Sequence, residues 1–297
     1  TDRQIACFIF SGLSCLFGAI IEPSLPRILP VLLLLFGDKY DSVRNAAEKA
    51  IQGITKNLTR ACVERVLPYA LEKVESDDSW RIQYTAILLV KSVIKSSPRN
   101  IGKFIPNIVS ALGKAIKSAA SQVRNSALET IDMLRSSITN EAVSEIFQFL
   151  VNAISNPSTL EIALEKISHL NLVQKLDNSS LSLIIPILIN GCSSSKMSVR
   201  TDSFKVLGNL PLISKDGALT QFSDILIEPL LSGISDPSPN LRAVAGNSLA
   251  ALVPCFEEGK YEQIMNKLLS ELKQQKTFAE RQGSSQAIAM LIKARGI

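Results

Sequence analysis

The sequence contains one histidine, His169, and none of the short motifs that mark nucleotide-dependent or metal-dependent enzymes. Most Ser/His and Cys/His relays, and metal sites built on two imidazoles, need histidines that this chain does not have. Neither a GxxxxGKS/T phosphate loop nor a GxGxxG fingerprint occurs, and no strand pattern is present to precede one. We therefore expect a noncatalytic protein without a cofactor, a metal or a small-molecule substrate, in which His169 lies on a helix surface or is half-buried.

Cysteines in disulfide or metal spacing are also lacking. The five cysteines show no CxxC spacing and lie in apolar segments, at Cys7, Cys15, Cys62, Cys192 and Cys255. An odd number of thiols cannot all pair within one molecule, and free buried thiols are typical of the reducing cytosol or nucleus. We therefore expect reduced thiols in a protein of the cytosol or the nucleus.

Long hydrophobic runs are missing as well. The longest, Ile28 to Phe36, contains Pro30 and is far shorter than the about 20 residues of a membrane helix, so we expect no membrane contact. No signal or transit peptide is recognisable. The chain starts at Thr1 in an apolar stretch that predicts the second helix of a hairpin whose first helix is missing, and hence a fragment of a longer protein. The residues expected to point inward are Ile5, Phe8, Ile9, Leu13, Leu16 and Ile20.

The residues that are abundant favour helices. The chain is 46% hydrophobic but only 5% aromatic, with a mean hydropathy of +0.21, and its apolar content is mainly Leu, Ile, Ala and Val, which suit close helix packing. This composition predicts an ordered, all-α protein. A formal charge of +5 permits an anionic partner without requiring one.

The stretch Ile227 to Val253 contains one complete helical hairpin. Pro229 suits the first turn of a helix, and Asp236-Pro237 ends that helix. Ser238 can cap the next helix, and Pro239 fits its first turn. That helix carries an apolar stripe at helical spacing, formed by Leu241, Ala245, Leu249 and Leu252. Two helices that are each apolar on one side need stacked neighbours to bury that side.

The same pattern recurs along the chain. Pro30, Pro68 and Pro106 are spaced by 68 − 30 = 38 and 106 − 68 = 38 residues, slightly below the period of about 40 to 47 residues for HEAT-type arrays. Pro186 follows after 186 − 106 = 80 residues, which leaves room for one irregular unit without its proline at 146–176. We therefore predict an α-α superhelix, a HEAT/armadillo-like solenoid of about seven helical hairpins plus an N-terminal half-hairpin, continuous over residues 1–297.

Arginine recurs early in the second helix of most units. Two interpretations compete: the arginines pair with turn aspartates or carbonyls and form an internal ladder, or they form a basic stripe for phosphate. The first is favoured because their spacing follows the repeat. The positions are Arg44, Arg81, Arg124, Arg200, Arg242 and Arg281.

Other basic residues lie off the repeat pattern, after second helices or near the turn of the third unit. They are candidates for contacts with an RNA backbone, although a solvated helix surface also needs lysines. The candidates are Lys56, Arg60, Lys95, Arg99, Lys103, Lys114 and Lys117. The single tryptophan, Trp80, lies at a turn in DDSWR, where we expect core packing under the next unit rather than an exposed binding anchor.

An ordered series of segments carries a family resemblance. LFGAIIEPSLPRILPVLLLLFGDKYDSVRNAAEKAI, the SWR turn, SLSLIIPIL and DPSPNLRAVAGNSLAALV together resemble the central region of the general-control activators. These are cytoplasmic HEAT-repeat proteins that act on ribosomes, and this region is similar to the HEAT domain of fungal translation elongation factor three. The turn at 190–196 is more neutral than the family's turn, which is expected to be basic.

The resemblance implies a noncatalytic scaffold whose partners are the ribosome, through rRNA and ribosomal proteins, and other subunits of a kinase-activating machinery. It implies support for activation of the kinase of initiation factor two alpha during amino-acid starvation, and no nucleotide cassette. The alternative is a protein-only HEAT interaction domain of the tubulin-binding or transport-receptor type, which the basic and aromatic turn DDSWR also fits.

Overall fold

The computed structural model describes residues 2–55, 58–76, 79–98, 101–136, 138–170, 172–273 and 277–295. These residues form fifteen α-helices and no strand, with one isolated bridge between Leu176 and Ser214. The all-α prediction is therefore confirmed. The packing divides the chain into two compact units, residues 1–139 and 140–297. A single solenoid running through both units stays a prediction.

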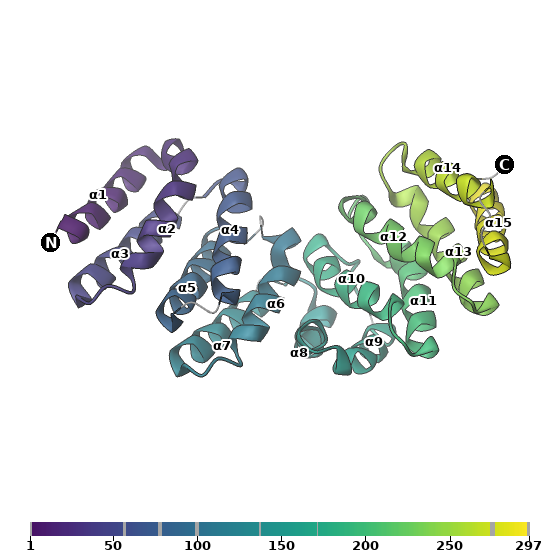
Figure 1. The fold of residues 1–297 in the computed structure, drawn as a ribbon, viewed down its shortest axis with the longest axis horizontal. Coiled ribbons are helices and arrows are strands. Elements are labelled where there is room, and N and C mark those ends of the chain that lie inside the picture. The colour runs from purple at the N-terminus through teal and green to yellow at the C-terminus, as the bar shows by residue number, and fades with distance from the viewer. Residues whose placement is uncertain are drawn as a thin grey trace. The chain divides into compact units, whose positions relative to one another are not determined.

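The first unit consists of one helix followed by three hairpins (Figure 1). The single helix is α1 (Asp2–Phe17), which packs against α3. The second helices of the hairpins also pack against one another, α3 on α5 and α5 on α7. The hairpins are α2 (Leu25–Leu35) with α3 (Asp41–Thr55), α4 (Arg60–Glu75) with α5 (Trp80–Ser96), and α6 (Ile105–Ala115) with α7 (Ser121–Ser136). Short 3-10 turns precede α2 and α6, at η1 (Gly18–Ser24) and η2 (Gly102–Phe104).

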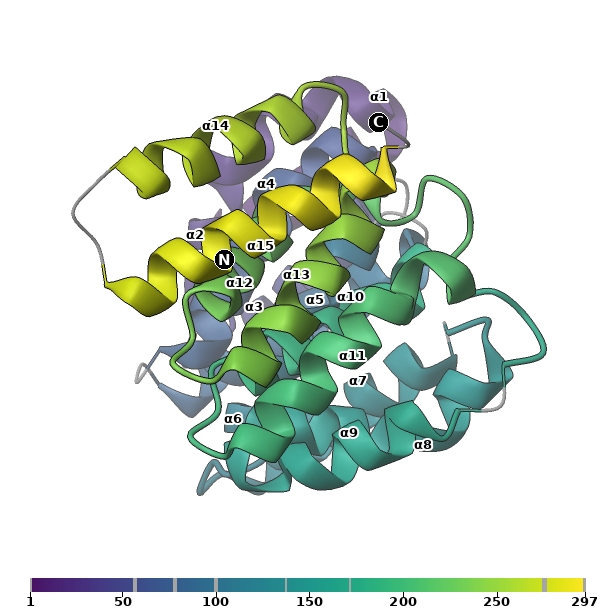
Figure 2. The same ribbon diagram turned by 90° about the vertical axis from the view of Figure 1, so that its right-hand side faces the viewer.

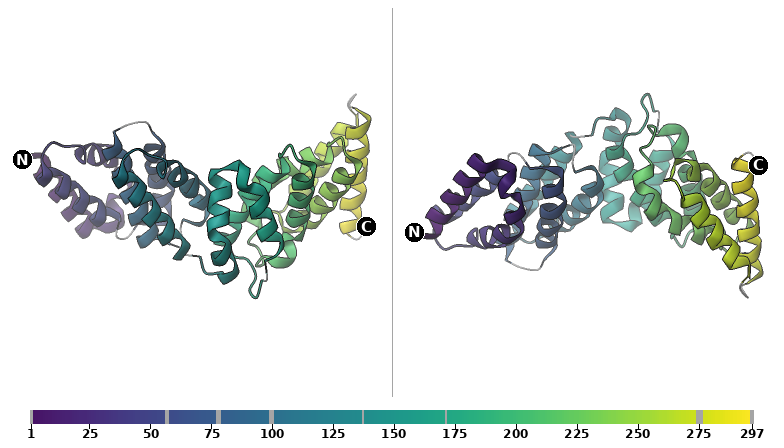
Figure 3. Two further views of the ribbon diagram at one scale, coloured as in Figure 1. Left: turned by 90° about the horizontal axis from the view of Figure 1, so that it is seen from below. Right: turned by 90° about the horizontal axis from the view of Figure 1, so that it is seen from above.

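The second unit consists of four hairpins. Its second helices α11, α13 and α15 lie side by side in one layer (Figure 2), and its hairpins follow one another in chain order (Figure 3). The hairpins are α8 (Glu141–Ser155) with α9 (Leu160–Ser168), α10 (Asn178–Cys192) with α11 (Met197–Ile213), α12 (Ser223–Ile234) with α13 (Pro239–Leu252), and α14 (Lys260–Lys273) with α15 (Phe278–Ala294). With α1 as the half-hairpin, the predicted seven hairpins plus one half are confirmed.

The core follows directly from the apolar stripe of each helix. In α3, Val43, Ala47 and Ala50 are fully buried, and Ile51 and Ile54 are 2% and 6% exposed. These residues recur every three or four positions, so they share one helix face. Burying a side chain of the size of Ile stabilises the fold by about 1.5–3 kcal/mol. The stacked hairpins therefore derive most of their stability from their neighbours.

Glycine allows the closest helix approach in the second unit. A Cβ atom on Gly283 of α15 would lie 1.9 Å from the carbonyl oxygen of Ile234, the last residue of α12. A backbone atom cannot move aside as a flexible side chain can. Gly283 is therefore required for the contact between α12 and α15.

Most first helices with a repeat proline begin earlier than that proline predicts, and α6, with Pro106 in its first turn, is the exception among the described helices. Pro229 lies in the interior of α12, which begins at Ser223, so its expected place in a first turn is wrong. Leu226, which is fully buried, lies before the proline, and this apolar contact extends the helix despite the missing hydrogen bond. Ser238 does not cap α13 with its side chain. Its amide instead donates to Asp236 Oδ1 at 2.8 Å.

The expected inward face of α1 is also wrong. Ile5, Phe8 and Ile9 are 56%, 48% and 54% exposed, and Leu16 and Ile20 reach 80% and 78%. The opposite side of α1, which carries the fully buried Cys7, is covered by α3. Among the described residues, α3 is the helix on which α1 packs, and the outer face of α1 is exposed.

Candidate nucleic-acid interface

The candidate cations lie at two opposite ends of the first unit's hairpins. Arg60 begins α4 and Lys95 lies in the last turn of α5, both at the end where one hairpin connects to the next. Lys114 and Lys117 lie where α6 turns toward α7. The length of α5 separates the two ends by roughly 25 Å, so the structure does not bring these cations into one patch. Of the others, Lys103 lies in η2, and Lys56 and Arg99 lie outside the described residues.

Two of these cations are exposed without an ion-pair partner. Arg60 Nε lies 3.2 Å from Glu64 Oε1, and Lys114 Nζ lies 3.0 Å from Glu75 Oε1. Within the described part of the chain, Lys95 and Lys117 have no such carboxylate. Lys95 borders a groove of about 640 Å³ whose lining includes Ile51, Leu88, Lys91 and Met133. Of the two lysines at this groove, Lys91 is paired through its Nζ with Glu129 Oε2 at 2.7 Å. Lys95 is therefore the one available to contact a phosphate.

Four of the repeat arginines bond to the turn that precedes their own helix. In each, Nη1 donates to the carbonyl oxygen six residues earlier, at 2.5 to 2.8 Å. The turn carbonyls are satisfied in this way, and the turn is held against its helix. The pairs are Arg44 with Asp38, Arg124 with Ser118, Arg200 with Ser194, and Arg242 with Asp236.

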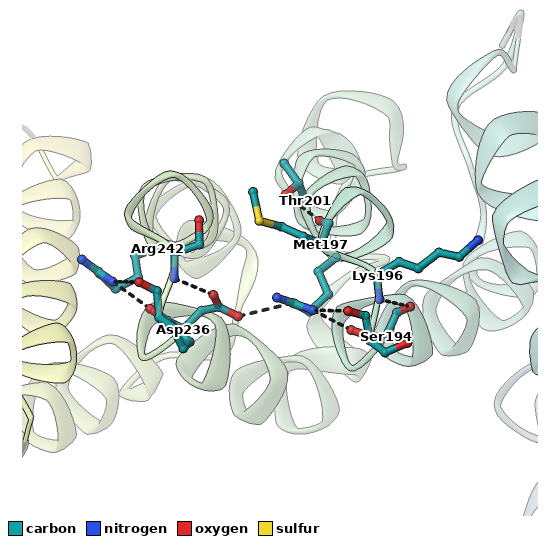
Figure 4. Close-up of polar contacts among 10 residues, drawn as sticks. Ser194, Lys196, Met197, Thr201, Asp236 and Arg242 are labelled. Atoms are coloured by element: carbon teal, nitrogen blue, oxygen red, sulfur yellow. Dashed lines mark hydrogen bonds and ion pairs between the residues drawn. The ribbon is translucent and has the colours of Figure 1, made fainter.

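The arginines of the second unit also connect successive hairpins (Figure 4). Arg200 Nε lies 3.3 Å from Asp236 Oδ2, in the turn of the next hairpin. Arg242 is only 4% exposed, and its Nη2 donates to Gln282 Oε1 of α15 at 2.7 Å. The buried guanidinium therefore depends on its hydrogen bonds for compensation of its lost hydration.

Sequence reasoning missed one member of this series, Arg3. Its Nη1 donates to Asp38 Oδ2 at 2.5 Å, and the Asp38 side chain is 2% exposed. The separation of 35 residues is close to the 236 − 200 = 36 residues between Arg200 and Asp236. This spacing could have identified Arg3 from the sequence. The other repeat arginines were recognised by the turn that precedes their helix.

Arg81 does not follow the carbonyl pattern among the described residues, and the residue six positions before Arg281 lies outside them. The Arg81 guanidinium lies over the Trp80 ring, 4.7 Å from its centroid, and both arginines are exposed. Among the described residues, neither has a carboxylate ion-pair partner. These two guanidinium groups are therefore available for contacts outside the chain.

Trp80 does not lie in the core, contrary to the expectation from the sequence. It is 37% exposed and borders an open depression of about 710 Å³. Gln83 and the turn at 118–122 form the rest of the lining. The ring reaches across to the next hairpin, as expected, but the small residues of that turn leave it partly uncovered.

Potential metal-ligating side chains are not grouped in the described part of the chain. Among them, no group of three His, Cys, Asp or Glu residues is arranged to hold a metal ion. His169 is exposed, with Nδ1 2.8 Å from the Glu165 carbonyl oxygen. Burial raises the pKa of the Cys62 and Cys192 thiols to about 12, so both are protonated and poorly nucleophilic near neutral pH. Within the described helices, none is both long enough and apolar enough to span a bilayer.

Two family models match this chain. Residues 2–131 match the model described as EF3 N-terminal HEAT repeat, and residues 159–263 match the Elongation factor 3/GNC1 HEAT repeat. The first match covers α1 to most of α7, and the second covers α9 to α13 and the first turn of α14. The HEAT-repeat interpretation of the hairpins is thereby confirmed.

Similar curated proteins extend over nearly the whole chain. The Stalled ribosome sensor GCN1 of Homo sapiens is 26% identical over 296 residues, which is 99% of this chain and 11% of that protein. The eIF-2-alpha kinase activator GCN1 of Dictyostelium discoideum is 29% identical over 293 residues, 98% of this chain and 11% of that protein. Elongation factor 3 of Gonapodya prolifera is 24% identical over 235 residues, 78% of this chain and 21% of that protein. The predicted resemblance is confirmed, and this chain spans about a tenth of the length of the GCN1 proteins.

Proposed function

We propose that this chain, whose HEAT repeats are related to those of the GCN1 proteins and elongation factor 3, acts as a noncatalytic, ribosome-associated scaffold in translational control in the cytoplasm. The observation that carries the proposal is the similarity over 98–99% of the chain to proteins named as a stalled ribosome sensor and as kinase activators. The similarity to elongation factor 3 over 78% of the chain supports the same class of partner.

The mechanism proposed is recognition through many weak contacts. Stacked hairpins present repeated turns and links on one rigid unit, and several weak contacts on one body raise the overall affinity strongly. The Arg124 hydrogen bonds hold the turn that directly follows Lys117, so Lys117 is presented from a fixed backbone. Lys95 is presented from the last turn of α5. Lysine contacts with rRNA phosphates are independent of sequence and weaken as salt rises.

The finer role proposed is support for activation of the initiation factor two alpha kinase during amino-acid starvation. The name of the Dictyostelium discoideum protein, eIF-2-alpha kinase activator GCN1, supports this step. The partners would be rRNA, ribosomal proteins and other subunits of the kinase-activating machinery. A scaffold performs this role by holding that machinery beside the ribosome, without a chemical step of its own.

Co-sedimentation of the 297-residue chain with purified ribosomes across a salt series tests the proposal. We expect binding at low salt that weakens steadily as salt rises. The double variant Lys95→Gln/Lys117→Gln should reduce the slope of log affinity against log salt by about 1.5, because each phosphate contact contributes about 0.7–0.9.

The control is Lys267→Gln/Lys293→Gln, which removes the same charge from exposed positions of α14 and α15. It should leave the slope close to that of the wild type. Absence of ribosome binding at low salt would contradict the proposal, and co-elution with tubulin in its place would favour a protein-only interaction domain.

A further inference from the structure

The turn at Trp80 combines an aromatic face, a guanidinium and an open depression. Ser79 caps α5, with its Oγ accepting from the Arg81 amide at 3.4 Å, and this places Trp80 and Arg81 together in the first turn of the helix. The Arg81 guanidinium lies over the ring at 4.7 Å from the centroid. The ring also borders the depression formed with Gln83 and the turn at 118–122.

The residues that line this depression beside Trp80 are small or polar, and the Trp80 ring is its one large apolar surface. Ser118, Ser121 and Gln122 carry hydroxyl and amide groups, and Ala119 and Ala120 carry only methyl side chains. Within the turn, Ser118 Oγ accepts from the Ala120 amide at 3.4 Å, and Ser121 Oγ donates to Gln122 Oε1 at 3.2 Å. The turn is held in shape by Arg124, whose Nη1 donates to the carbonyl oxygens of Ser118 and Ala119 at 2.8 and 2.7 Å. No carboxylate belongs to the described lining residues.

Both cations and carboxylates lie near the depression. Arg81 and Lys117 are exposed, and Lys117 directly precedes the lining turn. The carboxylate of Glu75, near the end of α4, pairs with Lys114 Nζ at 3.0 Å. Asp77 and Asp78 lie outside the described residues. An anionic ligand can therefore approach from the side of Arg81 and Lys117.

We infer that Trp80 and the turn at 118–122 bind an unstacked base of single-stranded RNA, with Arg81 and Lys117 at its phosphates. Exposed bases stack on aromatic side chains and on guanidinium planes, and their edges take hydrogen bonds from hydroxyl and amide groups. A hydrophobic peptide would need a larger apolar floor than one ring and two alanines. The inference rests on the proposed function and specifies one contact in it.

The fluorescence of Trp80 reports on this site alone, because it is the only tryptophan of the sequence. The 297-residue chain is titrated with a twelve-nucleotide oligoadenylate and with an abasic oligonucleotide of the same length and charge. We expect the oligoadenylate to quench the fluorescence in a saturable manner, because the base stacks on the indole. Absence of quenching at saturating RNA, or equal quenching by the abasic strand, would overturn the inference without needing any variant.

Variants then measure the contribution of the ring. Trp80→Leu should weaken oligoadenylate binding by about fivefold or more, the range for loss of one stacked base, and Trp80→Phe should restore most of it. The matched control is Tyr40→Leu, which removes another exposed aromatic with a cation over its ring, Lys39 Nζ at 4.9 Å from the centroid. Circular dichroism confirms that each variant is folded.

Ribosome co-sedimentation separates this inference from the proposed function. If Tyr40→Leu weakens oligoadenylate binding as much as Trp80→Leu, the effect is not specific to the site and the inference fails. If Trp80→Leu binds oligoadenylate normally while the wild type still sediments with ribosomes, only the base contact is wrong. If the wild type does not sediment with ribosomes, the proposed function fails first. A protein ligand that displaces the oligoadenylate and shields Trp80 from a soluble quencher would assign the site to a protein partner instead.

Discussion

The turns of the second unit and the Trp80 turn of the first unit use arginine in opposite ways. Arg200 and Arg242 are bonded to their own turn and to the next hairpin. Arg81 occupies the same place in its unit but lies over Trp80 and is exposed. Repeat position alone therefore does not decide whether an arginine is structural. Arg81 differs from Arg200 and Arg242 in that its guanidinium lies over the ring of the neighbouring Trp80.

The largest effect is expected from Arg242→Ala. The change leaves the carbonyl oxygens of Asp236 and Pro237 and the Gln282 side chain without their donor, in a site where the arginine is 4% exposed. Buried polar groups without partners cost about 1–3 kcal/mol each, so we expect a loss of about 3 kcal/mol in the free energy of unfolding. Urea denaturation followed by circular dichroism measures it, and a loss below about 1 kcal/mol would contradict the structural role.

A somewhat smaller effect is expected from Gly283→Ala, which tests the contact between α12 and α15. The new methyl group would meet the Ile234 carbonyl oxygen at 1.9 Å and Arg242 Cδ at 3.0 Å, and overpacking costs typically about 1–3 kcal/mol. Gly12→Ala is the control, because a Cβ atom there meets nothing within 4 Å. In the middle of α1 it should stabilise by about 0.5–1 kcal/mol. Equal effects of the two substitutions in urea denaturation would argue against the close approach.

A smaller effect again is expected from Asp38→Asn in the first unit. The substitution keeps an oxygen for the Tyr40 amide, which donates to Asp38 Oδ1 at 3.0 Å, but removes the charge that faces Arg3. Because the Arg3 side chain is 57% exposed, solvent screens the ion pair, and we expect a loss of about 1 kcal/mol or less. The loss should shrink further in 1 M salt, and a salt-independent loss would instead indicate a packing defect.

The smallest effect on stability is expected from Arg81→Ala. The Arg81 side chain is exposed, and its described contact is the Trp80 ring, so we expect a change within about 0.5 kcal/mol, as for most surface substitutions. Thermal unfolding of Arg81→Ala and of Arg242→Ala under the same conditions compares the loss of stability in the two variants directly. If both variants lose similar stability, the distinction between bonded and exposed repeat arginines is wrong.

The sequence was sufficient for the repeat architecture and insufficient for its exceptions. The hairpins are predictable because stripes such as Val43, Ala47 and Ile51 have helical spacing and turns such as Asp236-Pro237 interrupt them. The first residues of the helices are not predictable in this way, because buried residues before the proline, such as Leu226, extend α12. The apolar spacing of α1 did not identify its buried face, because spacing alone does not show which side a neighbouring helix such as α3 covers.

The candidate site was predictable only in part, for a related reason. Arginine spacing identifies the positions, but not whether the guanidinium turns toward a carbonyl, as in Arg124, or toward an aromatic ring, as in Arg81. The exposure of Trp80 depends on the size of residues 118–122 in the next hairpin, which local patterns do not report. The grouping of Lys95 with one hairpin end and Lys117 with the other likewise needs the three-dimensional path of the chain.

The central claim is that the exposed Trp80 turn contributes to ribosome binding. The most direct test is ribosome co-sedimentation of two variants, Arg81→Ala and Arg281→Ala. Each variant is compared with the wild type at the same folded fraction. Both variants remove an exposed repeat arginine, but only Arg81 lies over Trp80. The account predicts weaker ribosome binding for Arg81→Ala than for Arg281→Ala, with unchanged thermal stability in both. Wild-type binding by Arg81→Ala, or an equal loss in the two variants, would contradict it.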